Sequence, residues 1–281
     1  MMSNIPLQLG LIGYPLGHSL SPQLHHGALK AMDLPGEYRL FPIAPLPEGQ
    51  EALCRLIERL RRGELAGLNV TIPHKPNVLP LLDDQTPLVR RTGSANTLFM
   101  NAGRLIGDTT DVPGFLADLD GWLPPEMESG KKVLVLGAGG SARAVVVALQ
   151  ERGWQITLVA RRIAQAEELA ASLGGSFEIV TLESSHLARS GDISLIVNTT
   201  PVGMYPEVEG CPWPVELPLP RGAAVYDLIY NPAETVLLRR AREAGLPARN
   251  GLGMLVEQAA LSLEQWSGRI VPRKAMWEAV Q

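Results

Sequence analysis

The fold of this chain is decided at residues 131–144, KKVLVLGAGGSARA, where a strand pattern changes into a helix pattern within a few positions. The apolar run at 133–136 stops at Gly137, and an alanine-rich segment that favours a helix begins at Ala142. Glycines in the turn let a pyrophosphate approach the backbone, and the amides and dipole at the start of the helix favour its charge. Because residues 155–160 predict a second strand, this stretch predicts a βαβ unit that binds a nucleotide.

The glycine spacing by itself is weak support, because Ser141 or Ala142 stands at the third glycine position of the usual G-x-G-x-x-G pattern. A glycine turn that only lets two elements pack is the alternative. The strand before the turn, the helix after it and the second strand favour the nucleotide site.

The end of the second strand indicates which cofactor to expect. Sites for NAD usually place Asp or Glu there, to accept hydrogen bonds from the ribose hydroxyls. This chain has Ala160, Arg161 and Arg162 instead, and guanidinium groups suit a phosphate. We therefore expect NADP, with Arg161 as the leading phosphate ligand and Arg162 as a second. A solvated basic turn is the alternative.

The composition is typical of a soluble globular protein of one or two domains, with 281 residues, 46% hydrophobic and 19% charged. The net charge of -4 argues against nucleic acid or an anionic membrane as the main partner. The two cysteines, Cys54 and Cys211, are expected to be reduced thiols of a cytoplasmic protein. The sequence indicates neither a secretory leader nor a membrane span, and its histidines lack metal-ligand spacing.

Polar side chains follow the first predicted strand, at residues 7–12. The next segment, GYPLGHSLSPQLH, contains Ser19 and Ser21. Ser21 before Pro22 is a good helix N-cap, which would explain that serine without any ligand, whereas capping does not explain Ser19. Loops that leave the end of a strand in an α/β domain tend to bind ligands, so both interpretations stay open.

Two further residues are candidates for proton transfer. The segment GLNVTIPHK predicts a short strand and a proline turn that ends in Lys75, with Asn69 and Thr71 on one strand face. Lysine is the basic side chain whose pKa moves on partial desolvation. Asp111 ends the segment GDTTD just before a predicted helix. A solvent-facing lysine and a helix-capping aspartate are the alternatives.

The remaining pattern completes an α/β chain. It predicts a polar helix or turn at 83–91, a β-hairpin at 98–106, strands at 38–42, 193–198 and 224–228, and helices at 22–32, 48–62, 164–173, 233–244 and after Gly251. Asn231 is a reasonable cap for the helix at 233–244. Gln258 is the polar member of an otherwise apolar stripe in the last helix, so we expect it to bond backbone or a ligand.

With these segments in view, the chain resembles the shikimate dehydrogenase family over nearly its whole length. Residues 13–25 resemble its substrate-binding serine loop, 69–75 its NVTxPxK signature, 93–97 its GAxNT segment and 107–111 its GxNTD segment, followed by GAGGSARA, NTTPVGM, DLIYNPAETVLL and NGLGMLVEQAA. The chain departs from the family pattern at His26, Pro87, Thr109, Ala160 and Arg162. None of these departures removes a candidate catalytic group.

The resemblance implies an NADP-dependent oxidoreductase that reversibly reduces 3-dehydroshikimate to shikimate, in the chorismate pathway of aromatic amino acid biosynthesis. It implies that Lys75 and Asp111 are the catalytic pair. The implied shikimate ligands are Ser19, Ser21, Asn69, Thr71, Lys75, Asn96, Asp111 and Gln258, with Tyr230 nearby. The expected NADP residues are Gly137, Ala138, Gly139, Gly140, Ser141, Ala160, Arg161 and Arg162, to which the resemblance adds Leu228, Gly251 and Met254. No metal is expected.

We expect two α/β domains separated by a cleft. The substrate-binding catalytic domain comprises residues 1–111 plus 250–281, and the Rossmann-type NADP-binding domain comprises residues 112–249. A homodimer without nucleic-acid or membrane partners is a further expectation. The alternatives are a quinate/shikimate dehydrogenase that uses NAD and a non-catalytic NADP-binding sensor.

Overall fold

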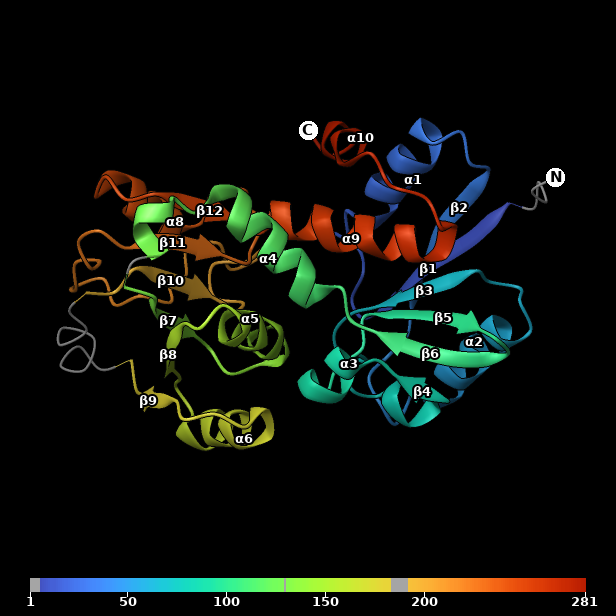
Figure 1. Cartoon of the computed structure of the whole chain (residues 1–281), viewed down its shortest axis with the longest axis horizontal. Helices are drawn as coiled ribbons and strands as arrows, with labels where there is room; N and C mark the ends of the chain where they lie inside the picture. Colours follow the sequence, from blue (N-terminus) through green and yellow to red (C-terminus); the bar gives the residue numbers. More distant parts are fainter. Residues whose placement is uncertain (1–5, 129, 183–191) are drawn as a thin grey trace. The chain divides into compact units, whose positions relative to one another are not determined.

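The computed structural model describes residues 6–128, 130–182 and 192–281. The chain forms two compact units. Unit 1 comprises Met1–Gly114 with Val256–Gln281, and unit 2 comprises Phe115–Leu255. Each unit contains a six-stranded sheet with helices packed on it, which confirms the α/β class (Figure 1). The functional division into a substrate domain and a cofactor domain, with its expected boundaries, stays a prediction.

The sheet of unit 1 has the strand order β2-β1-β3-β5-β6-β4. Only β5 runs against its neighbours, because it is antiparallel to both β3 and β6, whereas the other pairs are parallel. The hairpin predicted at residues 98–106 is the β5–β6 pair. The strands are β1 (Leu7–Gly13), β2 (Gly36–Pro42), β3 (Gly67–Val70), β4 (Asp84–Gln85), β5 (Thr97–Asn101) and β6 (Arg104–Asp108).

The helices of unit 1 follow the apolar periodicity of the sequence. In α2 (Gln50–Arg61), the side chains at positions 53, 56, 57 and 60 are buried and join a core cluster with side chains of β3, β5 and β6. The helix α1 (Ser21–Ala31) packs against β2 and against α10 (Arg273–Glu278), which the sequence did not predict (Figure 1). The segment predicted as a polar helix or turn forms the short strand β4 and α3 (Pro87–Thr92).

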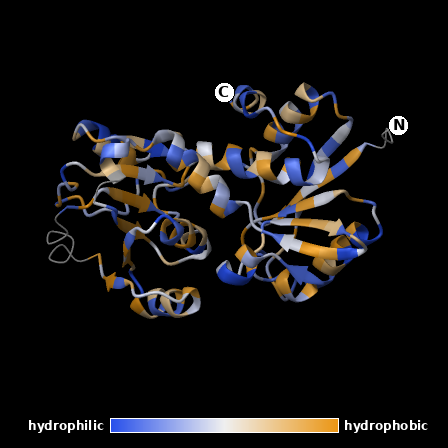
Figure 2. Ribbon diagram, in the orientation of Figure 1, coloured by the Kyte–Doolittle hydropathy of each residue, from blue (hydrophilic) through white to orange (hydrophobic). Residues whose placement is uncertain are grey.

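The sheet of unit 2 is parallel and doubly wound, with the strand order β12-β11-β10-β7-β8-β9. The three central strands, β11, β10 and β7, are almost entirely buried, and β10 is drawn in the hydrophobic colour in Figure 2. The strand order reverses between β7 and β10, which is where such sheets bind ligands. The strands are β7 (Lys132–Leu136), β8 (Gln155–Val159), β9 (Glu178–Val180), β10 (Leu195–Asn198), β11 (Ala224–Asp227) and β12 (Ala248–Asn250). The sequence predicted neither β9 nor β12.

Helices connect β7 to β8, β8 to β9 and β11 to β12, as the βαβ pattern requires. The predicted strand–turn–helix is β7 followed by α5 (Gly140–Glu151), and α6 (Ile163–Leu173) follows β8. The helix predicted at 233–244 is shorter, because α8 (Val236–Glu243) is capped by Thr235, whose hydroxyl accepts a bond from the Leu238 amide at 3.3 Å. The expected cap at Asn231 was therefore wrong. Two helices, α4 (Asp111–Trp122) and α9 (Leu252–Ser267), contribute residues to both units.

The proline-rich segment between β10 and β11 is fastened by one arginine of α8. The guanidinium of Arg240 donates hydrogen bonds to the carbonyls of Trp213, Pro214, Val215 and Leu217, at 2.8–3.3 Å. The Trp213 side chain is buried, and its indole N–H donates to the Leu217 carbonyl at 3.2 Å. The segment from 213 to 217 is thus fixed to the body of unit 2.

Within the residues that the structure describes, no helix is both long enough and apolar enough to cross a membrane. The cysteines Cys54 and Cys211 are both free thiols, as predicted.

Candidate active site

Lys75 and Asp111 form an ion pair in unit 1, with 2.5 Å between Lys75 Nζ and Asp111 Oδ2. Lys75 lies in the turn after β3, and Asp111 is the first residue of α4. His74 holds this turn in place, because its backbone N–H bonds the Thr71 carbonyl and its buried Nε2 contacts the Ile43 carbonyl at 2.8 Å. The Lys75 side chain keeps 22% of its surface exposed and Asp111 11%. The ammonium is thus within reach of a ligand while it stays oriented by the carboxylate.

Asn96 joins Asp111 to Gln258. The Asn96 amide nitrogen donates to Asp111 Oδ1 at 2.9 Å and to Gln258 Oε1 at 3.3 Å. Its oxygen accepts the Thr110 backbone N–H at 2.8 Å, which fixes the orientation of the amide. Three side chains from three separate segments, the loop before β5, α4 and α9, therefore meet at one place.

Asn69 lies in β3 next to this group and is buried. Its nitrogen donates to the Asn96 carbonyl and to Ser262 Oγ, both at 3.0 Å. Its oxygen accepts the hydroxyl of Tyr38 at 2.8 Å. The side-chain amides of Asn69 and Asn96 are both held by partners inside unit 1, which satisfies the requirement for buried polar groups.

Three buried hydroxyls, which no sequence pattern singled out, support these amides. Ser262 Oγ contacts Thr97 Oγ1 at 2.8 Å and Thr110 Oγ1 at 3.1 Å, and it donates to the Gln258 carbonyl at 2.9 Å. Ser262 could have been noticed, because it lies four residues after Gln258 on the same helix face. Nothing in the sequence shows that Thr97 and Thr110 would face it, since that depends on how the β5–β6 hairpin packs.

Ser19 lies just before α1, and Ser21 does not cap this helix. The helix already includes Ser21, and its N-cap residue is Leu20, which makes no side-chain capping bond. The capping interpretation of Ser21 was therefore wrong. Ser19 Oγ accepts the Ser21 backbone N–H at 3.3 Å, and the Ser21 side chain is buried.

The Tyr38 ring stacks on the His25 ring, with 3.9 Å between the ring centroids. Burial lowers the pKa of His25 to about 4 and raises the pKa of Tyr38 far above its usual value. His25 Nδ1 bonds the Ser21 carbonyl at 2.8 Å, so this nitrogen carries the proton. Both rings are therefore neutral around pH 7 and support the loop without charge.

The glycine turn of unit 2 follows β7. Gly137 has φ 105°, which favours glycine, and a Cβ there would lie 2.8 Å from Thr199 Oγ1. A Cβ at Gly139 or Gly140 would meet no protein atom within 4 Å. Packing thus explains Gly137 but neither of the other two, whereas a group that must approach the start of α5 would explain both.

The remaining expected cofactor residues also lie in unit 2. Arg161 and Arg162 are exposed directly after β8, and Arg162 donates to Gln165 Oε1 at 2.7 Å. Leu228 and Gly251 are close neighbours, because a Cβ on Gly251 would lie 2.0 Å from the Leu228 carbonyl oxygen. Met254 follows in the first turn of α9, Ala138 and Ser141 complete the glycine turn, and Ala160 precedes the arginines. Burial raises the pKa of Tyr230, which follows β11.

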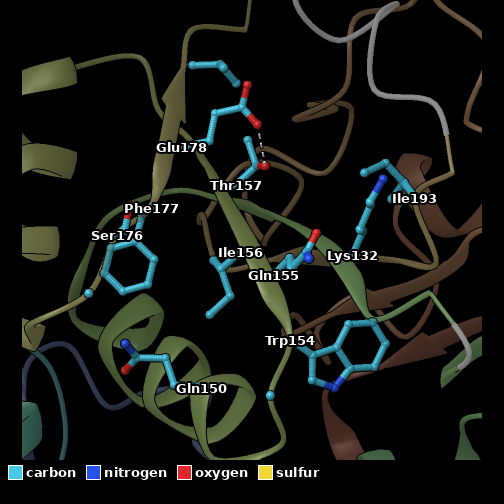
Figure 3. Close-up of a pocket in the computed structure, with 13 residues that line it drawn as sticks. Lys132, Gln150, Trp154, Gln155, Ile156, Thr157, Ser176, Phe177, Glu178 and Ile193 are labelled. Carbon is cyan, nitrogen blue, oxygen red and sulfur yellow. Dashed lines mark hydrogen bonds between the residues drawn. The ribbon is translucent and has the colours of Figure 1, made fainter.

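A pocket of about 730 Å³ lies elsewhere in unit 2 (Figure 3). Lys132, Gln155 and Glu178, which line it, are the first residues of β7, β8 and β9. The pocket is therefore at the amino edge of the parallel sheet, whereas the glycine turn is at the carboxyl edge, where ligands of such sheets bind. It contains none of the expected site residues.

The part of the chain that the structure describes contains no group of three or more His, Cys, Asp or Glu side chains that could hold a metal ion. His25 and His74 are core residues with backbone partners, which agrees with the structural interpretation of the histidines. His186 lies outside the described residues.

The chain is similar to known proteins over nearly its whole length. Residues 11–98 match the shikimate dehydrogenase substrate binding domain, residues 125–201 the shikimate / quinate 5-dehydrogenase domain and residues 251–281 the shikimate 5'-dehydrogenase C-terminal domain. The shikimate dehydrogenase (NADP(+)) of Salinibacter ruber is 42% identical, with 96% of this chain and 95% of that protein covered.

Solved structures give the same result. The Thermus thermophilus shikimate 5-dehydrogenase, in complex with NADP(H) and shikimate, is 38% identical with a TM-score of 0.84, and 97% of this chain and 98% of that chain are covered. The quinate dehydrogenase of Corynebacterium glutamicum, in complex with NAD, is 29% identical with a TM-score of 0.88, and 98% of each chain is covered. On these sequence matches and solved structures, the chain belongs to the shikimate dehydrogenase family.

Proposed function

We propose that this protein is an NADP-dependent shikimate dehydrogenase, which reversibly reduces 3-dehydroshikimate to shikimate in the chorismate pathway of aromatic amino acid biosynthesis. The observation that carries the proposal is the Lys75–Asp111 pair, held by Asn96 together with Gln258. The Salinibacter ruber relative, named for the same reaction, supports it.

Lys75 is the proton donor in this proposal. NADPH supplies the hydride when it is bound. As charge develops on the carbonyl oxygen of the substrate, the Lys75 ammonium stabilises that oxygen and gives it a proton. In the oxidation direction, the neutral amine takes the proton back. Asp111 accepts from Lys75 Nζ with one oxygen, and so it aims the ammonium while its other oxygen stays bonded to Asn96.

Polar side chains of unit 1 hold the ring substituents of shikimate in this proposal. Such a site rejects analogues that lack a hydroxyl, because its own buried polar groups would be left without partners. Lys75 and Asp111 contact the oxygen at the reacting carbon and an adjacent hydroxyl. The other proposed ligands are Ser19, Ser21, Asn69, Thr71, Asn96 and Gln258, with Tyr230 nearby.

The residues of unit 2 fit NADP. The open space at Gly139 and Gly140 suits a pyrophosphate at the start of α5, and Arg161 and Arg162 suit the additional phosphate of the adenosine ribose. The other proposed cofactor residues are Gly137, Ala138, Ser141, Ala160, Leu228, Gly251 and Met254.

Steady-state kinetics test the proposal. The purified protein should oxidise shikimate with NADP, and it should prefer NADP to NAD and shikimate to quinate. Replacement of the ammonium in Lys75→Met should lower kcat by about 10²–10⁴-fold. Equal turnover with NAD and quinate would instead assign the protein to the quinate/shikimate branch. No turnover with either acid would favour a sensor that binds NADP without catalysis.

The proposal includes a homodimer in the cytoplasm. Light scattering on the purified protein, at concentrations that span the assay range, tests the dimer, and a constant monomer mass would contradict it.

A further inference from the structure

The first turn of α4 and the middle of α9 approach each other at a single glycine. A Cβ added at Gly114 would lie 2.9 Å from the Cβ and backbone nitrogen of Gln258 and 3.0 Å from its Cα. Contacts under 3.0 Å essentially never occur for real Cβ atoms, and the atoms met are two backbone atoms of Gln258 and the Cβ fixed to them, none of which can rotate away. The absence of a side chain at 114 therefore sets how closely the two helices approach at Gln258.

The distance between the two helices also sets the distance between Asp111 and Gln258, two residues of the proposed site. Asp111 begins the same helical turn that contains Gly114, and Gln258 belongs to the opposite helix. The amide nitrogen of Asn96 bonds both, at 2.9 Å to Asp111 Oδ1 and at 3.3 Å to Gln258 Oε1. One amide group can reach both oxygens only while the helices are this close.

Helix propensity does not explain the glycine. Glycine in a helix interior costs about 1 kcal/mol relative to alanine, and α4 contains a second glycine, Gly121. At Gly121 an added Cβ would meet no atom within 4 Å. Two glycines of one helix thus differ in one respect: only Gly114 faces a backbone that an alanine would displace.

We propose that Gly114 is a positioning residue of the active site, which acts through Gln258 by setting the distance between that side chain and Asp111. The proposal rests on the proposed function, because it assigns Gln258 to shikimate binding. An alanine at 114 shifts α9 away by a few tenths of an ångström, and the bond from Asn96 to Gln258, the longer of the two, is lost first. Gln258 then no longer points to the substrate.

The test is steady-state kinetics of Gly114→Ala, with Gly121→Ala as the matched control. In Gly114→Ala, the loss of one neutral hydrogen bond to shikimate raises its KM by about three- to tenfold. The kcat changes less than about twofold and the KM for NADP is unchanged, because Lys75, Asp111 and the cofactor residues keep their contacts. Gly121→Ala keeps all wild-type constants.

A double-mutant cycle separates this role from a general loss of stability. If Gly114 acts through Gln258, Gly114→Ala adds nothing to the KM of Gln258→Ala, so the two effects are not additive. Additive effects, an unchanged KM in Gly114→Ala, or a Gly114→Ala protein that does not fold would each overturn the proposal. If the wild type does not turn over shikimate at all, the proposed function fails, and that result is distinct from an active wild type with an unaffected variant.

Discussion

The carboxylate of Asp111 divides its two oxygens between a charged donor, Lys75, and a neutral donor, Asn96. Asn96 is itself oriented by the Thr110 backbone N–H, so the direction of the carboxylate depends on backbone geometry and not only on its charge. The types and positions of these residues were predictable, because Lys75, Asp111 and Asn96 lie in segments that resemble the family. Their mutual distances were not, since they depend on the packing of a loop, a hairpin and a helix.

A single substitution at Arg161 tests whether this side chain contacts the additional phosphate of NADP. The variant Arg161→Glu should raise the KM for NADPH by about 10–100-fold, because it removes a charge-assisted hydrogen bond to a phosphate and adds a like charge. The KM for NADH should not rise. Arg221→Glu, the same charge change at another exposed arginine of unit 2, is the control. Equal effects on both nucleotides would contradict a phosphate contact at Arg161.

His25 predicts a pH dependence of stability. Its pKa is lowered from 6.5 to about 4 by burial, so below pH 6.5 the unfolded chain binds a proton that the native protein does not. The native state therefore loses stability as the pH falls from about 6.5 to about 4, and keeps it fully above 6.5. Between pH 7 and pH 5 this loss is about 2 kcal/mol.

Urea unfolding of wild type and His25→Phe at pH 7 and pH 5 checks this expectation. The variant should show a smaller loss of unfolding free energy on acidification, by about 2 kcal/mol. Parallel curves for wild type and His25→Phe would show that His25 does not resist protonation.

At the scale of helices and strands, the strand–turn–helix at β7–α5 and the β5–β6 hairpin were predictable from local pattern alone. Short elements were not. β4, β9 and β12 have only two or three residues each, so they contain too little periodicity to be recognised, and they form because a neighbouring strand offers them hydrogen bonds. The cap of α8 was misplaced because several polar residues precede that helix.

Asp118 of α4 anchors that helix to the sheet of unit 2. Its buried carboxylate accepts the hydroxyl of Tyr226 at 2.5 Å and is paired with the guanidinium of Arg249. The pKa of Tyr226 is raised by burial and by this carboxylate, so the phenol stays protonated and donates. Asp118→Ala should lower the unfolding free energy by about 3 kcal/mol, because it leaves a partly buried cation without its partner.

Asp120→Ala is the matched control. It removes an acidic residue from the same helix, and its ion pair with Arg152 is exposed. An exposed pair contributes at most about 1 kcal/mol. Urea unfolding of both variants should therefore separate them clearly, and equal losses would mean that Asp118 is not an anchor.

At the scale of the whole chain, unit 1 is completed by segments from both ends, since Val256–Gln281 joins Met1–Gly114. The α/β class and the return of the C-terminal helices follow from the order of the family-like segments. The close fit of α10 on α1 does not, because it depends on small side chains: a Cβ on Gly27 would lie 2.7 Å from Ala279 Cβ.

Removal of residues 269–281 should therefore destabilise unit 1 while unit 2 stays intact. The deletion removes the side chains of Val271 and Met276, which are buried in unit 1. Their burial stabilises the folded state by about 3–6 kcal/mol in total. Thermal unfolding should show a lowered first transition, and NADP binding, followed by fluorescence titration, should be retained. A chain that lacks only Gln281 should behave as the wild type. An unchanged melting curve after the longer deletion would show that α10 contributes little.

The bonds from Arg240 to the carbonyls between Trp213 and Leu217 have a consequence for the handling of this protein. A protease must draw several residues of extended backbone into its cleft, and a backbone whose carbonyls are held by a guanidinium resists that. Nicking of the long β10–β11 connection should therefore begin between Val202 and Gly210, where Val202, Met204 and Tyr205 are exposed, and spare the half that Arg240 holds. We expect this same segment, residues 202–210, to tolerate an inserted tag or fluorescent reporter better than the segment that Arg240 holds.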